Sequence, residues 1–93
     1  MITIDKIKEW VAAEKVFNLK YVRLATEYRF CGLYEDHGSM LTPGDVPISA
    51  GLIGYPGCPE GFRVGGESMS LNLTPNQDDA ANIKKLFGLD NSY

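Results

Sequence analysis

The chain has 93 residues, of which 44% are hydrophobic and 23% charged, and its net charge is −3. These values are typical of a globular protein and predict a single domain, 1–93, with a modest core. No apolar run approaches the roughly 18 residues that span a bilayer, and the N-terminal lysines are interleaved with apolar residues, unlike those of a signal peptide. We therefore expect a cytoplasmic protein with no membrane association.

Charge is unevenly distributed along the chain. The net charge is +2 for residues 1–29, −6 for residues 30–80 and +1 for residues 81–93. Phosphate binding needs clustered lysine and arginine, and Arg63 is the only basic residue of the middle segment. We therefore expect no direct nucleic-acid binding by this acidic half, whereas a protein partner with a basic surface fits it.

Residues 4–15 have the pattern of an amphipathic helix. Their apolar side chains fall within one arc of about 120° on a helical projection; they are Ile4, Ile7, Trp10 and Val11. Thr3 is placed to cap the first turn, and Trp10 is expected in the core.

Residues 19–34 alternate between apolar and polar side chains with a period of two, which predicts strand. One long bent strand preserves the alternation, and so do two strands joined by an odd-length loop near Thr26. A two-residue hairpin is disfavoured, because it puts Val22 and Leu24 on the face of Arg29 and Cys31. A helical alternative also exists, since Tyr21, Leu24, Ala25 and Tyr28 fit i, i+3, i+4 and i+7.

Residues 38–66 are rich in glycine and proline, which make up twelve of the 29 residues. Helices and central strands disfavour that density, yet the segment also contains several large apolar residues. We therefore predict an ordered irregular loop that forms the working surface and ends in a Gly65-Gly66 hairpin turn. In that hairpin Phe62 pairs with Met69, and a strand continues to Leu73.

The C-terminal helix is predicted from its end signals. Thr74 is the expected N-cap, followed by Pro75 at the first helical position and Gln77 at the third. Gly88 is expected just beyond the helix, in the left-handed region. Residues 89–93 are predicted to be frayed.

Few residues carry recognisable chemistry. The glycines at 51, 54 and 57 lack the spacing of a phosphate-binding loop, and Pro56 removes an amide that such a loop uses. Cys31 and Cys58 are too few for a disulfide scaffold and are expected to be free thiols. Neither cysteine nor the single histidine, His37, has the spacing of a metal site, so we predict no metal and no cofactor.

These patterns favour a non-enzymatic protein–protein interaction module, an inhibitor or adaptor that binds through residues 38–66. Its expected contact residues are Leu52, Ile53, Tyr55, Glu60 and Phe62, with Tyr55 at least partly exposed. An acidic rim would steer the partner, and it consists of Glu35, Asp36, Asp45, Glu60 and Glu67.

Two alternatives remain open. One is a small enzyme or ligand-binding domain that uses Cys31, His37 and Cys58. The other is a homo-oligomeric structural subunit whose apolar loop residues pair with their own copies. Proteins carried by phages and other mobile elements are often of this size, which is an analogy of size alone.

Overall fold

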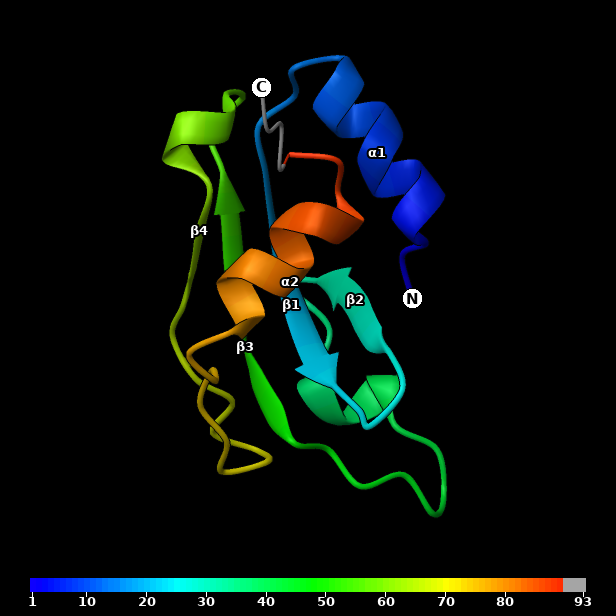
Figure 1. Cartoon of the computed structure of the whole chain (residues 1–93). Helices are drawn as coiled ribbons and strands as arrows, with labels where there is room; N and C mark the ends of the chain where they lie inside the picture. The colour runs from blue at the N-terminus through cyan, green and yellow to red at the C-terminus, as the bar shows by residue number, and fades with distance from the viewer. Residues whose placement is uncertain (90–93) are drawn as a thin grey trace.

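One antiparallel sheet organises the domain. The structure is a computed structural model that describes residues 1–89, and in these residues four strands lie in the order β2-β1-β3-β4. The strands are β1 (Phe17–Arg23), β2 (Tyr28–Gly32), β3 (Ser49–Tyr55) and β4 (Arg63–Gly65), with helix α1 (Ile4–Ala12) before them and α2 (Asp79–Leu86) after them. The predicted fold class, an α+β domain with a helix at each end, is confirmed (Figure 1).

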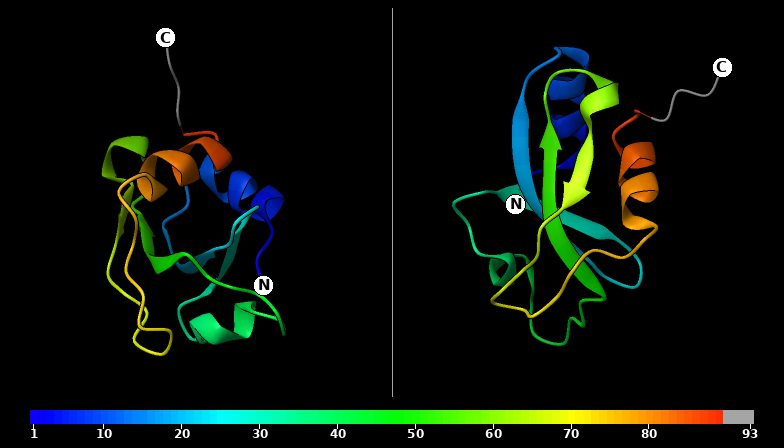
Figure 2. Two further views of the ribbon diagram at one scale, coloured as in Figure 1. Left: turned by 60° about the horizontal axis from the view of Figure 1, so that its bottom comes forward. Right: turned by 90° about the vertical axis from the view of Figure 1, so that its left-hand side faces the viewer.

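The two faces of the sheet are covered differently. Both helices lie on the first face, where the main core cluster combines helix and strand residues; among its members are Ile7, Leu19, Tyr21, Phe30, Ile53, Ile83 and Phe87. The second face is covered at one end by the short helix η1 (His37–Met40) and by residues 66–73 (Figure 2). A smaller cluster forms there from Val22, Cys31, Met40 and Ala50.

Helix α1 begins where its sequence predicts. The Thr3 hydroxyl accepts a hydrogen bond from the Lys6 N–H at 3.2 Å, so the predicted cap is confirmed. Trp10 packs against the main core, with its ring 5.6 Å from that of Phe17. The helix ends at Ala12 rather than residue 15, since Glu14 has a φ of 55° that no helix continues.

Residues 19–34 form two strands rather than a helix, but their connection is the hairpin that the sequence analysis disfavours. The Leu24 N–H donates to the Glu27 carbonyl at 2.7 Å, so Ala25 and Thr26 are the two turn residues, and Val22 pairs with Arg29. The expectation of an odd-length loop was wrong because both faces of the sheet are partly buried. Apolar side chains on either face of these strands can therefore be buried in a hydrophobic cluster.

The prediction of an irregular loop over residues 38–66 was wrong at its centre. Strand β3 pairs with β1 along its whole length, from Phe17↔Tyr55 to Arg23↔Ser49. The prolines of the segment all lie outside β3, and Gly51 is required inside it. An added Cβ at Gly51 would lie 2.7 Å from the Gly65 carbonyl oxygen and 2.7 Å from Cγ of Pro75.

The predicted hairpin at Gly65-Gly66 was also wrong. Strand β4 pairs back onto β3, with Ile53 opposite Val64, instead of forward onto residues 67–73. Gly66 does adopt a positive φ of 69°, but the chain then closes a separate turn through a bridge between Ser68 and Leu73. Met69 lies in that turn and is 86% exposed.

Helix α2 begins at Asp79, five residues after the predicted cap at Thr74. The Asp79 carboxylate accepts the Asn76 N–H at 2.9 Å and closes a turn ahead of the helix, while Pro75 packs at Gly51. Thr74 is exposed and the N-cap prediction was wrong, because tertiary contacts of residues 75–79 hold this segment outside the helix.

The end of α2 follows local rules. Gly88 has a φ of 75°, its N–H donates to the Lys85 carbonyl, and the Leu89 N–H donates to the Lys84 carbonyl, which together form a Schellman motif. The prediction for Gly88 is confirmed. Leu89 is buried rather than frayed, and the rest of the predicted frayed end, 90–93, lies outside the described residues.

Substitution of Gly51 tests this packing. Gly51→Ala should lower the free energy of unfolding by about 1–3 kcal/mol, because the backbone of Gly65 cannot move away from a new methyl group without disturbing β4. Gly65→Ala is the matched control, since a Cβ there meets no atom within 4 Å, and it should change stability by less than about 0.5 kcal/mol. Urea denaturation measures both. Equal effects of the two substitutions would contradict the packing described for Gly51.

Candidate functional site

The five predicted contact residues do not share one surface. Leu52 and Glu60 are exposed and Phe62 is half-buried, whereas Ile53 and Tyr55 are only 1% and 2% exposed. The Tyr55 ring stacks on Phe17 at 5.0 Å within the main core. The prediction that Tyr55 is partly exposed was therefore wrong, since β3 places alternate side chains on opposite faces of the sheet.

Among the described residues 1–89, none covers the part of the second face that lies beyond η1. We call it the open face, and it consists of Asn18 and Lys20 on β1, Leu52 and Gly54 on β3, and Arg63 and Gly65 on β4. Two shallow hollows of about 270 and 290 Å³ lie over it and share Asn18, Gly54 and Arg63. Figure 2 shows α2 on one side of the sheet and η1 toward the lower end of the other.

Glycine shapes this surface. Gly54 lies opposite Asn18 on β1 and Arg63 on β4, and Gly65 lies opposite Leu52. Neither glycine raises a side chain above the sheet, so the hollows form between the side chains that flank them. Val16 and Leu33 line the two ends of the combined hollow, and both are exposed.

The expected acidic rim is only partly available. Asp45 accepts hydrogen bonds from the Thr42 backbone and hydroxyl and from Arg29, the last at 2.8 Å. These bonds, with the Thr42 N–H foremost, lower the pKa of Asp45 to about 2. Asp45 therefore fastens the 41–48 segment to β2 instead of facing a partner, while Glu60 and Glu67 remain exposed.

The alternative site on Cys31, His37 and Cys58 gains no geometric support. His37 is buried, and its Nε2 donates to the Gly51 carbonyl at 2.9 Å. Cys31 is buried in the smaller cluster, and burial raises the pKa of its thiol. Cys58 is exposed, both cysteines are free as predicted, and within residues 1–89 no group of metal-ligating side chains gathers.

A buried carboxylate that the sequence analysis did not single out lies at the centre of a polar cluster. Asp79 is fully buried and accepts hydrogen bonds from the hydroxyls of Tyr21 at 2.6 Å, Ser49 at 2.7 Å and Tyr28 at 2.8 Å. Arg23 also binds Asp79 at 3.2 Å and its neighbour Asp78 at 2.9 Å. In the sequence, Asp79 is marked only by its neighbour Asp78, and the helix dipole favours acidic side chains at the start of any helix.

The cluster holds its members in fixed protonation states. Burial alone raises the pKa of the Asp79 carboxyl, but the hydrogen bonds from Tyr21, Ser49 and Asn76 outweigh it and the pKa is lowered. Burial and the neighbouring Asp79 raise the pKa of Tyr28 to about 12. Asp79 is thus an anion and Tyr28 a neutral donor throughout the neutral pH range.

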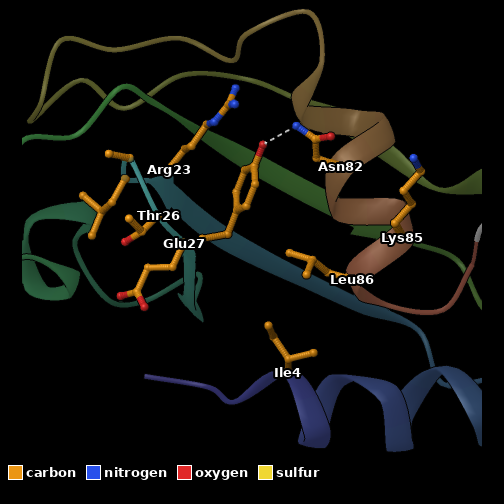
Figure 3. A pocket seen from close by; sticks show the side chains of 10 residues that line it. Ile4, Arg23, Thr26, Glu27, Asn82, Lys85 and Leu86 are labelled. Atoms are coloured by element: carbon orange, nitrogen blue, oxygen red, sulfur yellow. Dashed lines mark hydrogen bonds between the residues drawn. The ribbon is translucent and has the colours of Figure 1, made fainter.

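A pocket of about 530 Å³ opens beside this cluster, and we call it the hairpin pocket. The β1–β2 turn, the start of α1 and the outer face of α2 line it (Figure 3). Its lining residues are Ile4, Arg23, Leu24, Ala25, Thr26, Glu27, Tyr28, Asn82, Lys85 and Leu86. It lies on the helix-covered face of the sheet, so it is separate from the open face.

Comparisons with protein-family models, curated proteins and solved structures found no match to this chain. Among residues 1–89, no helix has the length and apolar character that crossing a membrane requires.

The low pKa of Asp45 predicts an acid-dependent contribution to stability. A folded-state pKa of about 2, below the ordinary 3.8, means that the charged form is favoured by folding. The difference in unfolding free energy between wild type and Asp45→Asn should therefore be constant above about pH 5 and shrink as the pH falls toward 2. Glu60→Gln, at an exposed carboxylate, is the control and should change stability by less than about 0.5 kcal/mol at neutral pH. A pH-independent effect of Asp45→Asn in urea denaturation would contradict this assignment.

The Asp79 cluster predicts an unequal effect of two tyrosine substitutions. Tyr21→Phe removes a buried hydroxyl that donates to a carboxylate, which should cost about 1.5–3 kcal/mol. Tyr34→Phe is the matched control, because the Tyr34 side chain is 105% exposed, and it should change stability by less than about 0.5 kcal/mol. Thermal and urea unfolding measure both, and a neutral Tyr21→Phe would show that the hydroxyl does not hold Asp79.

Proposed function

We propose that the protein is a non-enzymatic interaction module that binds a protein partner through the open face. The observation that supports this proposal is the uncovered half of the second sheet face. Within residues 1–89, three exposed apolar side chains lie along it, with exposed fractions of 37% for Leu52, 41% for Leu33 and 69% for Val16. An exposed apolar patch with a polar rim is typical of an interaction surface, and here the three side chains share a pair of adjoining hollows with Asn18 and Arg63.

The 290 Å³ hollow can accept one side chain of the partner. It is floored by Gly54 and Gly65, and Leu52 forms one wall. An aromatic or aliphatic anchor that enters a pocket at the centre of an interface supplies most of the binding energy, while surrounding contacts exclude water. The paired strands below it are rigid, so little conformational entropy is lost on binding.

Charge indicates which partner fits. Lys20 and Arg63 lie on the open face, and neither belongs to the ion pairs recorded within residues 1–89. The Lys20 ammonium donates to the Glu35 backbone carbonyl at 2.7 Å, which leaves its charge uncompensated. The partner surface is therefore acidic around an apolar anchor, in contrast to the basic partner that the acidic rim suggested.

The same charges argue against self-association through this face. A two-fold dimer brings the same patch of both copies together, so the lysine and arginine of one copy would approach those of the other. Like charges across an interface cost binding energy. The homo-oligomeric alternative is therefore weaker than a partner of different sequence.

The test compares two double variants of the full chain as baits for proteins of the source cell. Leu52→Asp with Arg63→Glu removes the apolar wall and reverses one charge of the open face. Val46→Asp with Lys8→Glu makes the same chemical changes at exposed positions outside it. A partner retained by wild type and by the control variant, and lost by the open-face variant, is expected. Purified partner should then bind the open-face variant at least about tenfold more weakly, a difference of about 1.4 kcal/mol.

Folding, salt dependence and oligomeric state of these proteins complete the test. Circular dichroism melts establish that both double variants fold. Association of wild type should slow as salt rises, because Lys20 and Arg63 act at long range. Equal capture by both variants would refute the open face as the binding surface. Sedimentation showing a wild-type dimer that the open-face variant lacks would instead support the homo-oligomeric alternative.

A further inference from the structure

The hairpin pocket has an apolar floor that the other residues of the described range, 1–89, leave uncovered. Ile4, Leu86 and the Tyr28 ring are partly buried against the main core, and the pocket opens above them. Figure 3 shows Leu86 facing Ile4 at one end of the pocket, with Arg23 and Asn82 at the other. Its volume of about 530 Å³ falls within the range of roughly 300–1,000 Å³ that small-molecule sites occupy.

The polar groups of the pocket are mostly satisfied by one another. The Tyr28 hydroxyl donates to Asp79 at 2.8 Å and accepts from Asn82 at 3.1 Å, so it holds the ring in place. The guanidinium group of Arg23 lies over the Tyr28 ring, with its carbon 5.5 Å from the ring centre. A ring that is fixed on two sides presents a preorganised apolar surface.

One cation that lines the pocket has no ionic partner among the described residues. Glu27 pairs with Arg29, and Asp78 and Asp79 pair with Arg23. Lys85 lines the pocket and belongs to none of the ion pairs recorded for residues 1–89. A single unpaired ammonium beside an apolar floor matches a ligand with one negative charge and a flat apolar body.

We propose that the hairpin pocket binds a small aromatic monocarboxylate, with the ring on Ile4, Leu86 and Tyr28 and the carboxylate at Lys85. A nucleotide or another polyanion fits poorly, because phosphate groups need several free donors and the remaining cation, Arg23, is engaged by two aspartates. This site lies across the sheet from the open face and does not depend on the function proposed above.

The experiment follows amide shifts of the ¹⁵N-labelled full chain while a probe is titrated. The probes are 2-naphthoate, its neutral analogue 2-naphthalenemethanol, and acetate, which has the charge without the ring. Saturable shifts at Ala25, Thr26, Asn82 and Leu86 are expected with 2-naphthoate, with a Kd of about 1 mM or tighter for a ligand of this size. The alcohol should bind more weakly, and acetate should not saturate.

Adjacent lysines provide the matched control. Lys85→Gln should weaken 2-naphthoate binding at least about threefold and leave the alcohol unaffected, because an exposed ion pair contributes modestly. Lys84→Gln, on the neighbouring residue outside the pocket lining, should leave both unchanged. Ala25→Trp, at an exposed position of the turn, should block the pocket to both probes.

Several outcomes would overturn the proposal. Shifts that do not saturate, or that fall on the open face, would place no ligand in the pocket. If Lys85→Gln and Lys84→Gln weakened 2-naphthoate binding equally, the effect would come from the overall charge of the protein and not from Lys85. If the alcohol bound as tightly as 2-naphthoate, the carboxylate would have no role in binding. Spectra of each variant without probe establish that the fold is retained.

Discussion

The buried carboxylate of Asp79 joins helix α2 to three strands at once. Its oxygens accept the hydroxyls of Tyr21 on β1, Tyr28 on β2 and Ser49 on β3, and Arg23 supplies the opposite charge. A buried carboxylate that loses its partners is strongly unfavourable, so any shift of α2 along the sheet would be penalised. No buried side-chain polar atom in the described residues lacks a partner, which is the condition under which such a cluster specifies one arrangement.

The position of α2 then determines what remains accessible. With both helices on one face, the gap between the β1–β2 turn, α1 and α2 becomes the hairpin pocket. On the opposite face η1 and residues 66–73 cover only one end, and η1 is held partly by Arg29 on the Met40 carbonyl and by His37 on the Gly51 carbonyl. The open face is the part that this short covering segment cannot reach. The two candidate surfaces are therefore consequences of one packing arrangement, yet they lie on opposite sides of the sheet.

The sequence predicted an irregular loop over residues 38–66, and only the parts of that segment outside strands β3 and β4 are irregular. Glycine and proline density across residues 38–66 predicted a loop, whereas the stretch between Pro47 and Pro56 is the central strand β3. Its glycines serve close packing at Gly51 and a hollow at Gly54, which only the neighbouring strands reveal. Of the predicted contact residues, Leu52 stays on a candidate surface while Ile53 and Tyr55 enter the core, since alternation along β3 separates them. Only strand pairing shows that Lys20 and Arg63 lie on the same face of the sheet.

What the sequence determined by itself is local. The amphipathic start of α1 with its Thr3 cap, the exit of α2 at Gly88 and the α+β class each depend on residues within one or two turns of each other. What tertiary structure decided involves distant partners: the two-residue hairpin, the pairing of β4 with β3, the burial of Tyr55 and the start of α2 at Asp79 instead of Thr74. Asp79 binds residues more than fifty positions away in Tyr21 and Tyr28, and a contact of that span outweighs a capping preference worth about 1 kcal/mol. Local propensity is a weak bias, and the burial of a paired carboxylate overrides it.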